Sequence, residues 1–258
     1  MIRDFFEERK FSVIFTVLVL MLGTVYYFTS GDGSIRVDPA IFEDLKLKAA
    51  YTPEGQIKIF ALADSNELAK MKASDGYSIP EAGTMIIGSS ESAMMIKEGK
   101  FSKVGDKIDN LFGINTTVGG VLKRTNTILD EFHFLGEQQF NQLDGEENRA
   151  FVKLKEGKEP KLFYTYLDGE NSKLKFNLSE GSLSDYSVIH KIAGEKYYPL
   201  ILGYSEAKMM RQEKLFSRPG DMIKGFFGIN VTIVGVAQRT NTSLDMAHII
   251  PLAEGDLK

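Results

Sequence analysis

The sequence contains no cysteine, and this absence excludes several classes of protein at once. Disulfide bonds, thiolate catalysis and cysteine-based metal sites are all ruled out. A lipid-modified lipoprotein is ruled out as well, because no cysteine is present to carry the lipid. The chain must therefore be stabilised by side-chain packing alone, which is normal for a protein of 258 residues.

Other signals are missing too. The formal charge is −4, and basic residues are spread along the chain without forming a stripe, which argues against a nucleic-acid partner. No H-E-x-x-H motif, no phosphate-binding loop and no Ser-His-Asp or Cys-His arrangement stands out. The sequence therefore favours a non-enzymatic protein and indicates no cofactor.

One long apolar segment is present near the N-terminus. Residues 11–29 carry no charge, and as a helix they would extend roughly 28 Å, close to the thickness of a bilayer core. Arg3, Arg9 and Lys10 precede the segment, so the positive-inside tendency places residues 1–10 in the cytoplasm. A cleaved signal peptide is the alternative, but it usually has a shorter apolar stretch and an A-x-A-like site. We expect a single-pass, uncleaved anchor in the cell membrane, with the rest of the chain extracytoplasmic.

The most informative feature is an internal duplication. Residues 88–133 align without gaps with residues 203–248, and 25 of the 46 aligned positions are identical. The shared core reads FGINTTVGGVLKRTNTILDEFH in the first copy and FGINVTIVGVAQRTNTSLDMAH in the second. A repeat of this length predicts two similar folded units.

Turn and strand signals divide the chain after the anchor. Residues 30–40 are a polar tether, and we expect a first β-rich unit at 41–145 and a second at 146–258. Short alternating or β-branched runs separated by Gly-containing turns predict mostly strands, with one or two short helices in each unit. The predicted fold class is α+β and β-rich, each unit being a small barrel or curled sheet.

The order of these segments resembles a known family. A strand, a Gly, a short helix, Gly-Asp, a hairpin, a Val-Gly-Val strand and an Asp follow one another in IIGSSESAMM, VGDKI, VGGVL and ILD, and again in the second copy. This order is similar to the MacB-like extracytoplasmic core domain of ABC transporter permeases. The resemblance implies a related extracytoplasmic β-rich module. It does not imply transport, because such permeases have several membrane helices and this chain has one candidate.

Polar residues that are identical in both copies are the candidate sites. An arginine fork with neighbouring hydroxyl and amide groups suits an anion or a peptide carboxylate, although such a run also commonly ends a strand. The candidate ligand or partner residues are Arg124, Thr125, Asn126, Thr127, Arg239, Thr240, Asn241 and Thr242. Glu91 and Glu206 lie in the first turn of a predicted helix, where a carboxylate interacts well with the helix dipole.

A metal site is the second candidate. Asp130, His133, Asp245 and His248 could supply oxygen and nitrogen ligands to a divalent cation. Residues three apart on a strand point to opposite faces, so each Asp-His pair would converge only across a bulge or bend. The structural alternative is a loop carboxylate that accepts backbone N–H groups beside an ordinary strand histidine.

These observations favour a membrane-anchored binding or scaffold module with a protein partner or self-assembly. A metal-dependent hydrolase or metal carrier is the first alternative, and an accessory subunit of a membrane transporter is the second.

Overall fold

A computed structural model describes residues 34–43, 45–63, 71, 73–77, 79–155, 159–166 and 174–257. The predicted cytoplasmic segment 1–10 and the predicted anchor 11–29 lie outside these residues, so both remain predictions. Within the described residues, no helix has the length and apolar character needed to cross a membrane.

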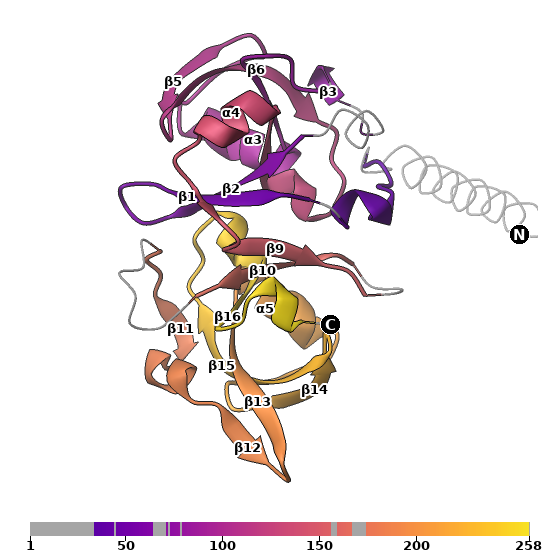
Figure 1. The fold of residues 1–258 in the computed structure, drawn as a ribbon, viewed down its shortest axis with the longest axis vertical. Coiled ribbons are helices and arrows are strands. Elements are labelled where there is room, and N and C mark those ends of the chain that lie inside the picture. The colour runs from indigo at the N-terminus through magenta and orange to yellow at the C-terminus, as the bar shows by residue number, and fades with distance from the viewer. Residues whose placement is uncertain are drawn as a thin grey trace, which may run out of the picture. The chain divides into compact units, whose positions relative to one another are not determined.

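Strands dominate the described residues, which confirms the β-rich α+β prediction (Figure 1). They form two sheets of eight strands each, one of them curled into a half-barrel. The first sheet contains β1 (Leu47–Tyr51), β2 (Ile57–Leu62), β3 (Ala73–Gly76), β4 (Thr84–Ile87), β5 (Lys107–Leu111), β6 (Ile114–Leu122), β7 (Phe132–Leu135) and β8 (Glu146–Glu147). The second contains β9 (Ala150–Lys153), β10 (Lys161–Thr165), β11 (Leu178–Gly181), β12 (His190–Ile192), β13 (Glu195–Leu202), β14 (Met222–Phe226), β15 (Ile229–Ala237) and β16 (Ala247–Ile250).

The helices of the described residues are few and short. The α-helices are α3 (Ser89–Lys97), α4 (Glu137–Gln142) and α5 (Tyr204–Gln212). The 3₁₀ helices are η1 (Pro39–Phe42), η2 (Ile128–Glu131), η3 (Leu183–Ser187), η4 (Ser243–Met246) and η5 (Glu254–Asp256). Helices α3 and α5 occupy equivalent positions in the two copies, each following a strand that ends at a glycine.

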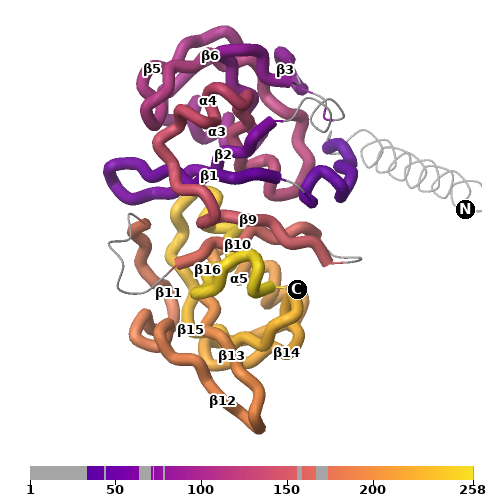
Figure 2. The backbone as a smooth tube through the Cα atoms, viewed as in Figure 1, coloured from indigo at the N-terminus to yellow at the C-terminus, as the bar shows by residue number. Residues whose placement is uncertain are grey.

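The two sheets share the same arrangement of seven strands and differ in the eighth, which is β8 in the first sheet and β12 in the second. The first has the order β3-β6-β4-β7-β2-β1-β8 with β5 on β6, and the second has β11-β15-β13-β16-β10-β9 with β14 on β15 and β12 on β13. Their irregularities also coincide, because the register shifts between Met85 and Ile86 in the first copy and between Leu200 and Ile201 in the second. Figure 2 traces this repeated path from the indigo strands to the yellow ones. The duplicated sequence therefore folds alike in both copies.

Strand alternation divides the interior into separate layers. In β2, Ile57, Ile59 and Ala61 belong to one hydrophobic cluster, while Phe60 belongs to another that also contains Met95 of α3. A third cluster surrounds Phe163 and α5 in the second copy. The face of each sheet that bears a helix is therefore a local core of its own copy.

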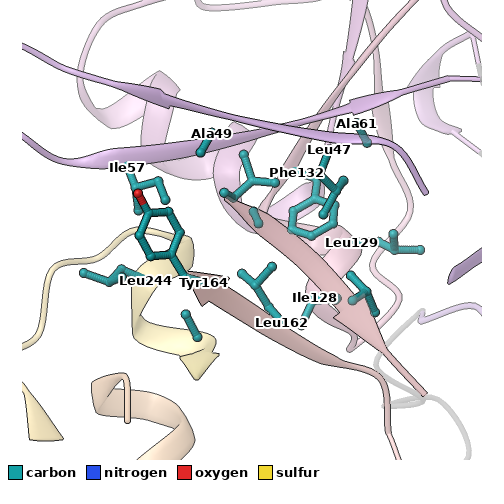
Figure 3. Packing of buried hydrophobic residues seen from close by; sticks show 14 of the residues in the cluster. Leu47, Ala49, Ile57, Ala61, Ile128, Leu129, Phe132, Leu162, Tyr164 and Leu244 are labelled. Carbon is teal, nitrogen blue, oxygen red and sulfur yellow. The ribbon is translucent and has the colours of Figure 1, made fainter. Parts of the chain in front are cut away.

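The opposite sheet faces share one cluster that contains residues of both copies. Ile57 and Phe132 of the first copy lie in it with Leu162 and Leu244 of the second (Figure 3). The hydroxyl groups of Tyr51 and Tyr164 also form a hydrogen bond between the copies. Residues 35–258 accordingly form one compact unit.

A glycine at the start of each helix permits a close backbone approach. A Cβ atom at Gly88 would lie 2.3 Å from the carbonyl oxygen of Leu129, and one at Gly203 would lie 2.1 Å from that of Leu244. Real Cβ atoms do not approach an oxygen so closely, so both positions require glycine. These glycines hold the first turn of α3 and α5 directly against the loops that carry Asp130 and Asp245.

Candidate functional site

A buried charged triad lies beneath α3 in the first copy. The Lys58 Nζ atom lies 2.7 Å from Glu91 Oε1, and the His133 Nε2 atom lies 3.3 Å from the same oxygen. The three side chains are 8%, 0% and 1% exposed. Three ionisable groups so deep in a small domain are unusual and need a specific explanation.

The second copy contains the same triad. Lys161 Nζ lies 2.9 Å from Glu206 Oε1, and His248 Nε2 lies 3.3 Å from that oxygen. The lysine also donates a hydrogen bond to Oε2 at 3.1 Å. The histidine contact has an ion-pair distance but lacks the alignment of a hydrogen bond.

Strand register brings these residues together. Phe60 of β2 lies opposite His133 of β7, and their rings stack with centroids 4.5 Å apart. Lys58 is two residues before Phe60, so its side chain points to the same face, towards α3. Glu91, in the first turn of α3, lies within ion-pair distance of both Lys58 and His133. The second copy repeats this arrangement with Phe163 stacked on His248 at 4.9 Å.

Both glutamates are held in the ionised form. Burial of the Glu91 carboxyl raises its pKa, but attraction to His133 and Lys58 outweighs burial, and the net pKa lies below the ordinary value. The Glu206 carboxyl has a lowered pKa for the same reasons, with His248 and Lys161 as its partners. The expectation that these carboxylates mainly serve a helix dipole was therefore incomplete, because each is the centre of an ion cluster.

The imidazole of His133 faces acceptors on both sides. Its Nδ1 atom lies 3.4 Å from the carbonyl oxygen of Ile59, and its Nε2 atom lies 3.3 Å from Met95 Sδ as well as from Glu91. Both ring nitrogens are therefore engaged by neighbouring groups. The other carboxylate oxygen of Glu91, Oε2, has no hydrogen-bond partner in the described part of the chain.

A cavity of about 880 Å³ lies over the first triad. Its walls come from the β1–β2 turn at residues 51–56, from α3, and from the β5–β6 turn at residues 110–113. Met95, Leu111 and Phe112 contribute apolar surface, and Lys58, Glu91 and His133 all line it. The first copy thus combines a pocket of ligand size with a few convergent polar groups, the usual composition of a binding site.

The same region of the second copy is filled by aromatic rings. Phe226 stands where the first copy has Leu111, and its ring centroid lies 5.1 Å from that of His248. The Phe226 ring also contacts Phe163 and Phe227, at 6.1 Å and 5.1 Å. One substitution at the β-hairpin therefore covers the second triad with a ring that the first triad does not have.

The repeated Arg-Thr-Asn-Thr segments form a capped loop in each copy. Asp130 Oδ1 accepts hydrogen bonds from the N–H and Oγ1–H groups of Thr125, at 2.8 Å and 2.9 Å, and Oδ2 accepts from the N–H group of Asn126. Asp245 makes the same bonds to Thr240 and Asn241. These segments maintain the fold, which explains their retention in both copies.

Arg124 and Arg239 have different surroundings. The segment containing Arg239, Thr240, Asn241 and Thr242 lines a second cavity, of about 630 Å³, together with Ser90 and Met94 of α3. In the first copy the carbonyl oxygen of exposed Arg124 accepts the N–H group of Ile35. Thr127 and Thr242 act as N-caps of η2 and η4. The second-copy segment therefore forms part of a cavity wall.

The structure does not bring the predicted metal ligands together. The Asp130 carboxylate is occupied by backbone and hydroxyl donors, while His133 points towards Glu91, and the second copy repeats this with Asp245 and His248. No cluster of three or more His, Cys, Asp or Glu side chains suited to a metal ion occurs in the part of the chain that the structure describes. The loop-carboxylate alternative describes Asp130 and Asp245.

Glu131 has no acidic counterpart in the second copy, where Met246 takes its position. Burial raises the pKa of Glu131 to about 7, and the nearby carboxylates of Glu91, Asp130 and Asp245 add to the effect. Glu131 also lines the second cavity, so its charge state alters that surface near neutral pH.

Lys58 and Lys161 are the site residues that sequence reasoning missed. The signal was present as Lys-Ile-Phe at residues 58–60 and Lys-Leu-Phe at residues 161–163. These tripeptides lie outside the gapless repeat, and their spacing to the following histidine differs between the copies. Comparison with known proteins adds no further evidence, because no protein-family model, curated protein or solved structure matches this chain.

Proposed function

We propose that this protein is a non-enzymatic binding module, held at the outer face of the cell membrane by residues 11–29. The first copy carries the ligand cavity, and the second copy is its closed structural counterpart. The observation that carries the proposal is the Lys58–Glu91–His133 triad at the wall of an 880 Å³ cavity, set against an equal triad covered by Phe226.

The geometry supports binding more directly than catalysis. The Glu91 carboxylate is already engaged by Lys58 and His133, and its pKa is lowered, which suits a fixed charge better than a general base working near neutral pH. The cavity combines apolar side chains with a few charged groups, which is the composition of a binding site. The extracytoplasmic location rests on the charge distribution around residues 11–29.

Methionine methyl groups give a direct test in the intact protein. Met95 and its counterpart Met210 in α5 are both packed in the core of their own copy, but Met95 also lines the cavity. The full-length chain, ¹³C-labelled at the methionine methyl groups and kept in detergent, is titrated with n-butanol, n-butylamine, butyrate and phenol. We expect at least one of these compounds to shift the Met95 signal saturably without shifting Met210.

The control is Leu111→Phe, which copies the ring of the second site into the first. It should abolish the Met95 response without changing the triad. If none of the four compounds moves the Met95 signal, or if Leu111→Phe leaves the response unchanged, the cavity is not a ligand site and the proposal fails.

A second candidate function, docking of a protein partner, rests on a different feature. The chain between β11 and β13 contains η3 and β12, which have no counterpart among the described residues of the first copy. It exposes Leu183, Val188, Ile189 and Ile192 to 43–47%. Exposed apolar residues grouped on a projecting hairpin are typical of interaction surfaces. The triple variant Val188→Ser, Ile189→Ser and Ile192→Ser should show less crosslinking to neighbouring proteins in membranes. Unchanged crosslinking would contradict this role.

A further inference from the structure

The free carboxylate oxygen of Glu91 indicates the chemistry of the ligand. Glu91 is fully buried, Oε1 contacts both Lys58 and His133, and Oε2 has no hydrogen-bond partner in the described residues. A buried carboxylate oxygen without a donor is costly, so a ligand that supplies a donor gains the full value of that bond. Glu91 is also part of the cavity wall. The site is therefore complementary to a hydrogen-bond donor.

The charge of the cavity wall indicates which donor. Carboxylates outnumber ammonium groups by four to two among the lining residues. The acidic members are Glu54, Glu91, Glu98 and Asp144, and the basic members are Lys58 and Lys100. Apart from Glu91, these carboxylates are exposed, so they attract cations towards the entrance. A positively charged donor suits this wall better than an anion.

The remaining wall selects for an aliphatic body. Met95, Leu111 and Phe112 provide apolar surface between the entrance and the triad. Met95 is unbranched and lies against His133, so its side chain can adjust to a ligand without movement of the backbone. A chain of a few methylene groups would cover this surface while its charged end reaches inward.

We propose that the first-copy cavity binds a protonated primary amine on an aliphatic chain, with the ammonium group donating to Glu91 Oε2. This inference rests on the binding function proposed above and names its ligand class. The carboxylates at the entrance offset the added positive charge. The second copy also has a carboxylate oxygen without a hydrogen-bond partner in the described residues, Glu206 Oε1. It does not bind such a ligand, because the Phe226 ring packs against His248 there and Lys161 lies within ion-pair distance of Glu206 Oε1 and donates to Oε2.

Three compounds of similar shape and different charge test the ligand class. The full-length, methyl-labelled chain is titrated at pH 7 with n-butylammonium, n-butanol and butyrate, and the Met95 signal is followed. We expect n-butylammonium to bind at least about tenfold more tightly than either of the others, as a charge-assisted hydrogen bond requires. Equal or tighter binding of butanol or butyrate would overturn the amine assignment while leaving the binding function intact. A Met95 signal that responds neither to these three compounds nor to phenol would overturn both.

Variants locate the selectivity at one carboxylate. Glu91→Gln keeps an acceptor for Lys58 but removes the charge, so it should eliminate the preference for the ammonium compound. The matched variant Glu206→Gln in the second copy should leave that preference unchanged. If Glu91→Gln does not fold, Glu98→Gln at the exposed entrance offers a second measurement. This variant should bind n-butylammonium about two- to threefold more weakly than the wild type and should bind n-butanol with unchanged affinity. Unchanged ammonium affinity in both Glu91→Gln and Glu98→Gln contradicts the assignment.

Discussion

The two copies of the duplicated unit keep the same buried triad but place it in different surroundings. In the first copy Lys58, Glu91 and His133 line a cavity, and in the second the ring of Phe226 packs against His248. A charge cluster that survives in both settings cannot be explained by ligand binding alone. The role that both copies share is structural, because the cluster joins a helix to two strands. In the first copy the cluster also lines a cavity.

The largest expected effect comes from breaking either triad. Lys58→Met or Lys161→Met leaves a buried carboxylate without its lysine partner, which should lower the free energy of unfolding by about 3–5 kcal/mol. Far-UV circular dichroism during urea unfolding measures this in a chain without tryptophan.

The control for this experiment is Lys153→Met on β9. Lys153 pairs with exposed Glu254 at 3.7 Å, so its removal should cost less than about 1 kcal/mol. Adding Glu91→Gln to Lys58→Met should recover part of the loss, because the unpaired charge is removed. A cost below about 1 kcal/mol for both lysine variants would show that the triads are dispensable for the fold.

The next effect concerns Glu131, the acid that the second copy replaces with Met246. Its pKa is raised from 4.5 to about 7 by burial first and by neighbouring carboxylates second. Because the folded state binds this proton more tightly, the contribution to stability is complete below pH 4.5 and is lost as the pH rises through 7. The loss should reach up to about 3 kcal/mol.

Glu131→Gln should therefore flatten the fall in stability between pH 4.5 and 7, as measured by thermal unfolding across that range. Glu213→Gln, at the exposed end of α5, should leave the fall unchanged. Glu91 and Glu206 act in the opposite direction, because their lowered pKa values make stability fall as the pH drops below about 4.5. An identical slope in wild type and Glu131→Gln would contradict the assignment.

The smallest effect comes from exchanging the hairpin residues. Phe226→Leu removes a partly buried ring and should cost about 1 kcal/mol, while Leu111→Phe should change stability by less than about 0.5 kcal/mol. More informative is the methyl signal of Met210, which should become sensitive to small molecules only in Phe226→Leu. If it stays silent, a feature other than this ring closes the second site.

The sequence was sufficient for the repeated parts of the fold but not for the site. Identity between residues 88–133 and 203–248 predicted two like units, and Gly and β-branched residues marked turns and strands that the structure contains. The candidate loop was also recognised as a capped strand end, which is how Asp130 and Asp245 are used. These features depend on neighbouring residues, so local patterns reveal them.

The triads depend on contacts between distant residues. Lys58 and Glu91 are 33 positions apart and meet only because β2, β7 and α3 are layered. A lysine that alternates with apolar residues on a strand normally reaches solvent, and a glutamate in the first helical turn normally serves the helix terminus. In this protein both side chains are buried and paired with each other. Their burial results from the packing of the whole fold, so the sequence of one segment does not reveal it.

The hydrophobic cluster that draws on both copies has a consequence for the history of this gene. Neither copy would be stable alone in water in its present form, because separation would expose apolar side chains to solvent. These are Ile57 and Phe132 of the first copy and Leu162 and Leu244 of the second. A single unit with this apolar face would have to pair with a second copy, as in a homodimer. Once two copies are joined in one chain, each can change its sequence independently of the other. A cavity can then form in one copy alone, as it has in the first copy of this protein.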